Sequence, residues 1–207
     1  MPTDSLQLIG AGGHAAVVAD AALLSGEGRM IVYSQDRDQV GHDVLGYMVQ
    51  HLDEGIVLRR IHVAIGNNVV RSRLQQQFSG RGAIPTTVFH PQATIAATSA
   101  AGAGSFVAAG AVLAPRSRIA EGVIVNHRAI VDHDVLVGEF SHIAPGSVLG
   151  GGVKVGSGVL IGAGATVLPG VAIGDGATIG AGAIVLTDVS AGATVVGVPG
   201  REMRKNV

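Results

Sequence analysis

The stretch VGSGVLIGAGATVLPGVAI, residues 155–173, carries Val or Ile at every sixth position. Traced outwards, this spacing runs from residue 95 to residue 185, and fifteen of its sixteen positions hold Val, Leu or Ile. Four residues further along each repeat, all sixteen positions hold Ser, Ala or Val. No insertion breaks the register, so the pattern is a genuine internal repeat and not a chance run of apolar residues.

A period of six predicts a parallel β-helix. Each hexad forms one face of a three-sided prism, so three hexads make one coil of about 18 residues. One aliphatic side chain per hexad points inward, and the small residue fits near a corner. Aromatic residues make up only 3% of the chain, which suits a narrow prism filled by aliphatic side chains.

The bulk composition excludes several classes of protein. The 207 residues include no cysteine and have a formal net charge of −1, so a disulfide framework and a thiolate metal site are excluded. No basic run marks a nucleic-acid surface. No apolar run approaches the ~20 residues of a membrane helix, and the start MPTDSLQLIG lacks a cationic segment. We therefore expect a cytoplasmic protein that binds neither nucleic acid nor membrane.

The N-terminal part has a different pattern, in which apolar strands alternate with helical segments. This alternation predicts a small Rossmann-like α/β domain over residues 1–90, followed by the β-helix over residues 91–207. His90-Pro91 marks the boundary. The predicted strands are 6–10, 29–34, 62–66 and 85–89, and the predicted helices are 14–24 and 67–78.

Two glycine turns follow predicted strands in this domain. Gly10, Gly12 and Gly13 lie between a strand and a helix, an arrangement in which backbone N–H groups and the positive helix end can face a phosphate. Alone, this pattern fits a nucleotide site and a tight turn equally well. A second turn, AIGNN at 64–68, ends another strand, and two such turns favour a ligand crevice at the strand ends.

The motifs IGAGGH (9–14), AIGNN (64–68), VDHD (131–134) and GEFSH (138–142) occur in this order with the hexads. Together they resemble the hexapeptide-repeat acyltransferases, and among them bacterial nucleotide-sugar N-acetyltransferases and sialic-acid O-acetyltransferase-like proteins. The resemblance implies a left-handed β-helix and a homotrimer with active sites between subunits. It also implies acetyl-CoA as co-substrate, no metal, and a nucleotide-linked amino sugar, of the 4-amino-4,6-dideoxy type, in the N-terminal domain. Relatives often have paired acids where this chain has Tyr33-Ser34-Gln35-Asp36, so uridine and guanosine both remain open.

His133 and Asp134 are the candidate catalytic pair. Acyl transfer needs a base that removes a proton from the nucleophile, and a histidine beside a carboxylate suits this role at neutral pH. The family's base is a histidine followed by an acid, which the resemblance carries onto His133 and Asp134. It further implies coenzyme contacts at His142, Gly151, Ala163 and Ala181. For the substrate it implies contacts at Gly10, Gly12, Gly13, His14, Asp36, Gly66 and Asn67.

Spacing places the two histidines apart. His142 is nine residues after His133, half a coil, so the two lie on different sides of the prism. Ala163 and Ala181 are one coil apart and stack in one column, whereas Gly151 stacks on His133. Both columns can meet one ligand only in a cleft between subunits.

Three other functions remain as alternatives. A sugar O-acetyltransferase of the sialic-acid type would use the same residues. A non-catalytic binding module would not need the His133–Asp134 pair. A zinc carbonic anhydrase on this scaffold needs histidines two coils apart, and no repeat histidine has one. The ending GVPGREMRK also resembles acetyltransferase tails, in which Arg201, Arg204 and Lys205 either meet coenzyme phosphates or are simply solvated.

Overall fold

Five parallel strands form the sheet of the N-terminal domain in the computed structural model, which describes residues 5–203. The strand order places β1 at the centre, with β2 on one side and β6 on the other. This is the open parallel sheet expected from the alternation of strands and helices. In spatial order the strands are β5 (Gln50–His51), β2 (Met30–Ser34), β1 (Leu6–Ile9), β6 (Arg60–Val63) and β7 (Ile84–Pro85).

Two helices cover opposite faces of this sheet. The side chains of Leu8 and Val32 pack with helix α1 (Gly13–Leu24). The alternate residues of the strands, such as Ile9, pack with helix α2 (Asn68–Ser79). Peripheral elements are a short 3-10 helix, η1 (Arg37–Gln39), and a hairpin of β3 (Asp43–Val44) and β4 (Tyr47–Met48).

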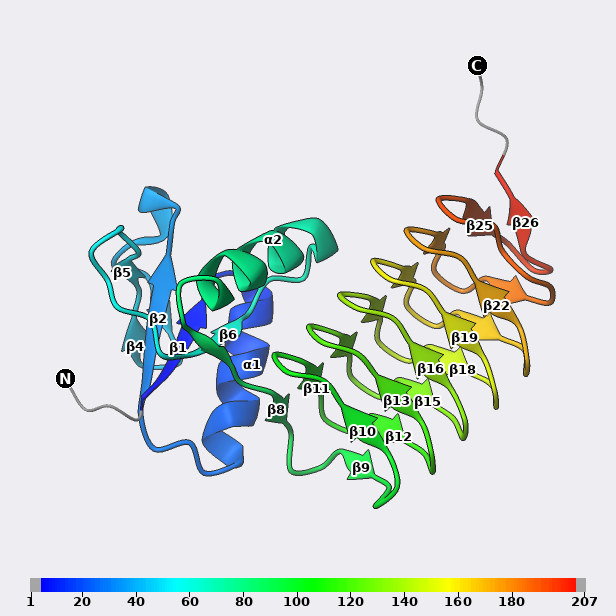
Figure 1. The fold of residues 1–207 in the computed structure, drawn as a ribbon, viewed down its shortest axis with the longest axis horizontal. Helices are drawn as coiled ribbons and strands as arrows, with labels where there is room; N and C mark the ends of the chain where they lie inside the picture. The colour runs from blue at the N-terminus through cyan, green and yellow to red at the C-terminus, as the bar shows by residue number, and fades with distance from the viewer. Residues whose placement is uncertain (1–4, 204–207) are drawn as a thin grey trace.

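The second part is a parallel β-helix with three faces (Figure 1). Most strands have two residues and pair in parallel with the strand 18 residues further on, for example Val131 with Leu149. The predicted fold class is therefore confirmed.

Each face of the prism is one sheet. The face on which the N-terminal domain packs, called the domain face, contains β8 (Val88–Phe89), β11 (Phe106–Val107), β14 (Ile124–Val125), β17 (His142–Ile143), β20 (Leu160–Ile161), β23 (Thr178–Ile179), β25 (Thr194–Val196) and β26 (Arg201–Glu202). The third face contains β9 (Thr94–Ile95), β12 (Val112–Leu113), β15 (Ile130–Val131), β18 (Val148–Leu149), β21 (Thr166–Val167) and β24 (Ile184–Val185). The groove face contains β10 (Ala100–Ala101), β13 (Arg118–Ile119), β16 (Leu136–Val137), β19 (Lys154–Val155) and β22 (Ala172–Ile173).

Turns between these strands form three corners of the prism. The Ala163 corner, with residues 144–147 and 162–165, joins the domain face to the third face. The His133 corner, with residues 132–135 and 150–153, joins the third face to the groove face. The Phe140 corner, with residues 138–141, joins the groove face back to the domain face.

One position in each turn adopts the left-handed conformation. From residue 104 to residue 182, every sixth residue has a positive φ, and ten of these fourteen residues are glycine. Left-handed backbone favours glycine because a Cβ crowds the following carbonyl there. The four exceptions are Arg116, Arg128, Asp134 and Phe140, so strain is concentrated in two neighbouring coils.

The predicted strand 85–89 divides into two strands that belong to different sheets. β7 pairs with β6 in the N-terminal sheet, whereas β8 pairs with β11 in the β-helix. Thr86 still donates its backbone N–H to Ile61 O (2.7 Å). The hydroxyl of Thr87 already donates to Gly102 O of the β-helix (2.8 Å). The chain therefore passes directly from one sheet to the other, without a flexible linker.

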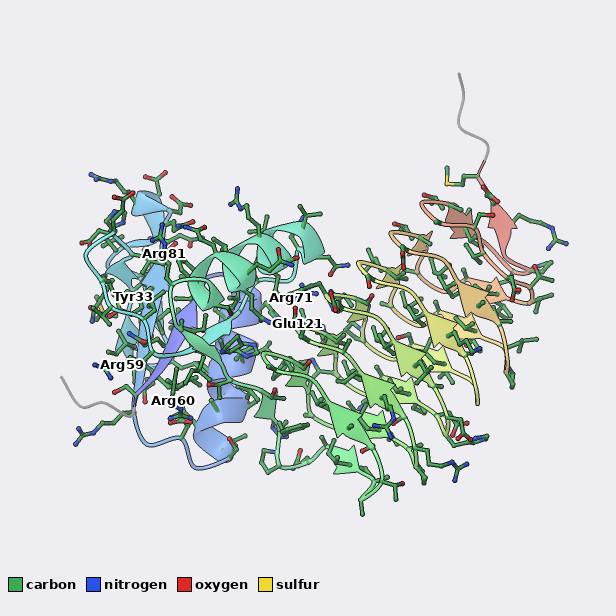
Figure 2. All side chains as sticks on the ribbon, viewed as in Figure 1. Tyr33, Arg59, Arg60, Arg71, Arg81 and Glu121 are labelled. Carbon is green, nitrogen blue, oxygen red and sulfur yellow. The ribbon has the colours of Figure 1, made fainter. Side chains whose placement is uncertain are left out.

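The N-terminal domain packs on the domain face and on the Phe140 corner. Phe106 and Ile124 of the domain face share one apolar cluster with α1. On α2, Arg71 is 1% exposed and reaches into the Phe140 corner beside Glu121 (Figure 2). Within residues 5–203, no helix is long and apolar enough to cross a lipid bilayer.

Candidate functional site

His133 and Asp134 form a hydrogen-bonded pair on an outer corner of the prism. Nδ1 of His133 lies 2.8 Å from Oδ2 of Asp134. Arg116, one coil below, donates from Nε to Oδ1 (2.6 Å) and from Nη2 to Oδ2 (2.7 Å) of the same carboxylate. Hydrogen bonds from Arg116 and His133 lower the pKa of Asp134 below its usual range, so Asp134 is ionised at neutral pH. An ionised carboxylate only accepts, so His133 carries its proton on Nδ1 and leaves Nε2 free to accept one.

Because Gly151 has no side chain, the ring of His133 can lie against its backbone. A Cβ built on Gly151 would lie 2.5 Å from Cε1 and Nε2 of His133. The backbone repeats this stacking, because Gly152 N–H donates to His133 O (2.9 Å). The predicted neighbourhood of Gly151 and His133 is therefore present, with Gly151 giving close approach to the imidazole.

A cavity of about 440 Å³ lies at the carboxyl ends of β1, β2 and β6. This is the place where open parallel sheets bind ligands. The backbone conformation at Gly10 requires glycine, since its φ is +118° and a Cβ would lie 2.9 Å from Ala64 O. A Cβ at Gly12 or Gly13 meets nothing within 4 Å, so these two positions leave open space for a ligand. The predicted residues lining the cavity are Gly10, Gly12, Gly13, His14, Asp36 and Gly66.

Asn67 is predicted to contact the substrate together with Gly66, but the structure shows it as a helix cap. It does not line this cavity. Its side chain caps helix α2 by accepting from Val70 N–H (3.0 Å). A ligand contact by Asn67 therefore stays a prediction that the geometry does not support.

His14 connects this cavity to the β-helix. Its ring lies edge-on to Phe106, with centroids 5.5 Å apart, and 6.4 Å from the ring of His142. Nε2 of His14 is buried without a hydrogen-bond partner. Nδ2 of Asn126 lies 3.1 Å from Nε2 of His142. His142 lies at the end of the domain face that is followed by the Ala163 corner, and Asn126 is bound to it there.

These histidines are neutral at neutral pH. Burial, followed by the charge of nearby His62, lowers the pKa of His14 to about 3. Burial, followed by the charge of Arg71, lowers the pKa of His142 to about 4. Burial also lowers the pKa of His62 to about 4, against a hydrogen bond with Thr86 that raises it. His14 therefore presents a neutral hydrogen-bonding group to the cavity and adds no positive charge there.

The Ala163 corner presents a column of small residues beside an open pocket of about 800 Å³. Ala163 and Ala181 stack as predicted, because Gly182 N–H donates to Ala163 O (2.8 Å). The pocket lies on the coils below them and is lined by Gln92, Ala109, Gly110, His127, Arg128, Pro145 and Gly146.

Both parts of the chain match known protein families. Residues 5–78 match the PglD N-terminal domain, and residues 152–187 match the bacterial transferase hexapeptide (six repeats). The acetyltransferase domain of PglB from Neisseria gonorrhoeae FA1090 is 36% identical over 97% of this chain and 100% of that chain, with a TM-score of 0.92. The chain belongs to the hexapeptide-repeat acyltransferases.

Other solved structures share this fold. A histidine-to-alanine mutant of GDP-perosamine N-acetyl transferase from Caulobacter crescentus, in complex with CoA and GDP-perosamine, is 33% identical, with 97% of each chain covered and a TM-score of 0.91. WeeI from Acinetobacter baumannii AYE, at 22% identity and a TM-score of 0.64, shares the fold. No curated protein sequence matches the chain significantly. The predicted family and the acyltransferase class are thus confirmed.

The acyltransferase structure separates the predicted residues into two groups. His14, His142 and the cavity of the N-terminal domain lie together at the domain face, next to the Ala163 corner. His133, Asp134 and Gly151 lie at the corner formed by the other two faces. In a three-sided prism that corner is opposite the domain face, and each face is one hexad of at most ~20 Å. Within one chain, the two groups therefore lie on opposite sides of the prism.

Sequence reasoning missed Arg71, Arg116 and His127. Arg71 is buried against the β-helix, and His127 lines the pocket at the Ala163 corner. Arg116 had a detectable signal, because it replaces a glycine of the left-handed column. Arg204 and Lys205 lie outside the described residues, whereas Arg201 is exposed and donates to Gly200 O (2.9 Å).

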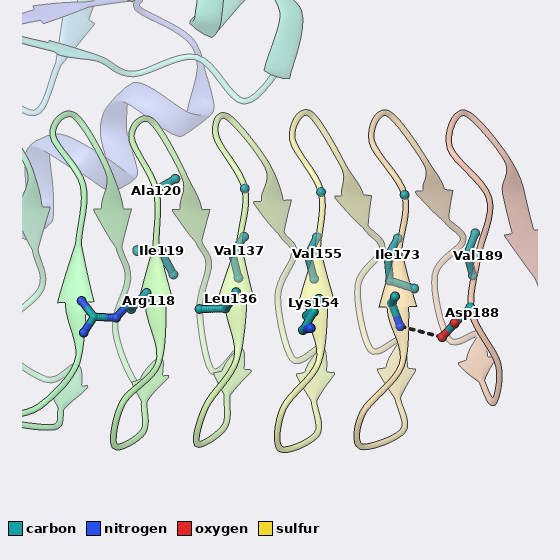
Figure 3. Close-up of a pocket in the computed structure, with 14 residues that line it drawn as sticks. Arg118, Ile119, Ala120, Leu136, Val137, Lys154, Val155, Ile173, Asp188 and Val189 are labelled. Atoms are coloured by element: carbon teal, nitrogen blue, oxygen red, sulfur yellow. Dashed lines mark hydrogen bonds between the residues drawn. The ribbon is translucent and has the colours of Figure 1, made fainter.

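A further depression of about 590 Å³ lies on the groove face (Figure 3). Arg118, Leu136 and Lys154 follow one another along it, and Asp188 accepts from Ala172 N–H (2.8 Å) at its end. None of the predicted site residues lines this depression. Among residues 5–203, no group of three or more His, Asp or Glu side chains is placed to hold a metal ion.

Proposed function

We propose that this acyltransferase transfers the acetyl group of acetyl-CoA to the amino group of a nucleotide-linked amino sugar, with His133 as general base. The observation that carries the proposal is the His133–Asp134 pair, whose 2.8 Å hydrogen bond uses Nδ1 and leaves Nε2 of a half-exposed imidazole to accept a proton. The Caulobacter relative supports this, because two of its structures with CoA and GDP-perosamine carry a substituted histidine.

The reaction needs little from the protein beyond a base and accurate positioning. The amine nitrogen attacks the thioester carbonyl, a C–N bond forms, and Nε2 of His133 takes the proton that the amine loses. The C–S bond then breaks, and the sulfur of CoA leaves and takes up the proton. The products are the amide and CoA–SH. Asp134 keeps the imidazole in the reactive tautomer.

The sugar nucleotide occupies the cavity between the two glycine turns. Backbone N–H groups at the start of α1 face the phosphates. The nucleoside lies beside Asp36, which lines the cavity just after β2. The sugar extends past neutral His14 towards the Ala163 corner. Acetyl-CoA lies along the column of Ala163 and Ala181, with His142 at its inner end.

His133 of a different subunit completes this site. The base corner and the cavity lie on opposite sides of one prism, so a symmetric trimer with three shared sites satisfies both. The sugar O-acetyltransferase alternative would use the same cleft. The named substrate of the Caulobacter relative is an amino sugar, which favours N-acetylation.

A substrate screen tests the proposed function. Purified protein receives acetyl-CoA with GDP-perosamine, a UDP-linked 4-amino-4,6-dideoxy sugar, or sialic acid, and free thiol is measured over time. We expect thiol release with one nucleotide-linked amino sugar and a product heavier by one acetyl group. Release with sialic acid alone would contradict the proposal.

The glycine turn gives a separate prediction for the nucleotide. Gly12 lines the cavity and a Cβ there meets no protein atom within 4 Å, so we expect the side chain of Gly12→Val to take up space in the cavity. Such crowding costs about 1–3 kcal/mol, which raises KM for the sugar nucleotide about 5- to 150-fold. The KM for acetyl-CoA should stay unchanged. Steady-state kinetics with each substrate varied in turn measures both values.

Gly28→Val is the matched control, because Gly28 is exposed, lies in a loop outside the cavity, and also has no atom near a built Cβ. It should leave both KM values unchanged. Normal nucleotide KM in a folded Gly12→Val protein would place the nucleotide elsewhere.

A further inference from the structure

Arg116 and Asp134 occupy equivalent positions in successive coils, 18 residues apart. Both adopt the left-handed turn conformation, with φ near +61°, where most of the described coils have glycine. A non-glycine residue there costs about 1–2 kcal/mol. The side chains of Arg116 and Asp134 are 65% and 43% exposed, and exposed ion pairs add little to stability. Folding stability therefore does not account for this pair.

The contacts of the Arg116–Asp134 pair indicate a role in orienting His133. Arg116 binds both carboxylate oxygens of Asp134, at 2.6 and 2.7 Å. This bidentate contact fixes the plane of the carboxylate. Oδ2 then lies 2.8 Å from Nδ1 of His133, whose ring rests against Gly151. Arg116 thus restricts where Asp134 can place the imidazole, through the carboxylate that both side chains bind.

The backbone of Asp134 adds a reason for this device. Asp carries its carboxylate on a short side chain, and the left-handed φ of +61° at this residue restricts where that carboxylate can lie. The guanidinium from the coil below holds it in the productive orientation.

We propose that Arg116 is a positioning residue of the acetyl-transfer site, acting on His133 through Asp134. This proposal rests on the proposed role of His133 as base. The guanidinium of Arg116 binds the carboxylate of Asp134, so we expect its effect to fall on turnover and not on binding.

Arg116→Gly tests the proposal, because glycine removes the guanidinium and relieves the left-handed strain. The expected protein unfolds at the wild-type temperature or higher, yet kcat falls about tenfold, the lower range for outer residues that orient a reactive group. The KM values for acetyl-CoA and for GDP-perosamine, or the UDP-linked sugar selected by the screen, should change less than about twofold. Arg116→Lys keeps one charge without the fork, so it should recover part of the lost kcat.

A double variant separates positioning from a general loss of charge. Arg116→Gly combined with Asp134→Asn should be no slower than Asp134→Asn alone, because both changes remove the same function. Arg73→Ala, which changes an exposed arginine on α2, should match wild type. An additive double loss, or wild-type kcat in Arg116→Gly, overturns the proposal.

His133→Asn, measured in parallel, distinguishes this proposal from the proposed function. If His133→Asn is inactive while Arg116→Gly is normal, only the role of Arg116 is wrong. If both variants are normal, the base assignment and the role of Arg116 fail together.

Discussion

Replacing His133 by Asn should lower kcat/KM by about 10²–10⁴-fold, the usual contribution of a general base. The amide of Asn can still donate to Asp134 in place of Nδ1, so the corner keeps its hydrogen bond (2.8 Å in the native pair). It has no atom equivalent to Nε2, so no group accepts the amine proton. Because the side chain is 56% exposed, the fold should be unaffected. Steady-state turnover and circular dichroism measure the two effects.

His42→Asn provides the matched control, since His42 is an exposed histidine of the N-terminal domain away from the cavity. It should retain wild-type turnover. If His133→Asn stays within about threefold of wild type, well below the 10²-fold minimum for a base, His133 is not the base.

The second large effect concerns Arg71, which joins the two domains. Its guanidinium donates to Gly122 O (2.7 Å) and Phe140 O (2.9 Å) of the β-helix, and to Ile65 O (3.0 Å) of the second glycine turn. These acceptors are all backbone carbonyl oxygens, and burial lowers the pKa of Arg71 to about 10. It therefore stays charged at neutral pH and is stabilised by carbonyl dipoles.

Arg71→Met fills similar space but leaves these buried carbonyls without their donor, at about 1–3 kcal/mol each. Removal of a buried charge offsets part of this cost. We expect a net loss of about 3 kcal/mol, or roughly 6–12 °C in the midpoint of thermal unfolding. Differential scanning calorimetry at matched protein concentration measures it.

Arg73→Met on the same helix is the control, because Arg73 is exposed. It should unfold within about 1–2 °C of wild type, as most surface substitutions do. A similar result for Arg71→Met would show that the carbonyl contacts do not stabilise the domain interface.

The β-helix could be predicted in detail from sequence because its period determines its register. Once every sixth residue points inward, Val131, Ile143 and Leu149 must all be buried, and each is 0% exposed. The same register predicted the stacking of Gly151 on His133, since residues 18 apart lie directly above one another. The cavity followed from a rule about strand ends that holds for open parallel sheets.

The interface between the domains could not be predicted in this way. Arg71 and Arg73 lie in the same helical segment, and only docking against Gly122, 51 residues away from Arg71, decides which is buried. Asn67 is a second case, because a polar residue after a strand is suited both to a ligand contact and to capping the next helix, and the structure shows that it caps α2. Such choices depend on contacts between distant segments, which local patterns do not encode.

The proposed function requires that the cavity of one chain and His133 of another form each active site. Mixed trimers of two inactive variants test it most directly. His133→Asn removes the base, whereas Ala163→Trp blocks the coenzyme column at an exposed corner and leaves His133 intact. The two proteins are unfolded, mixed in equal amounts and refolded, and native mass spectrometry of distinguishable tags verifies the exchange of subunits.

In random trimers, half of the chains have an open column and half of their neighbours supply an intact base. About a quarter of the sites then have both, so shared sites in a symmetric ring predict recovery of about a quarter of wild-type activity. Activity that remains at the level of either parent, despite verified exchange, would contradict the shared site.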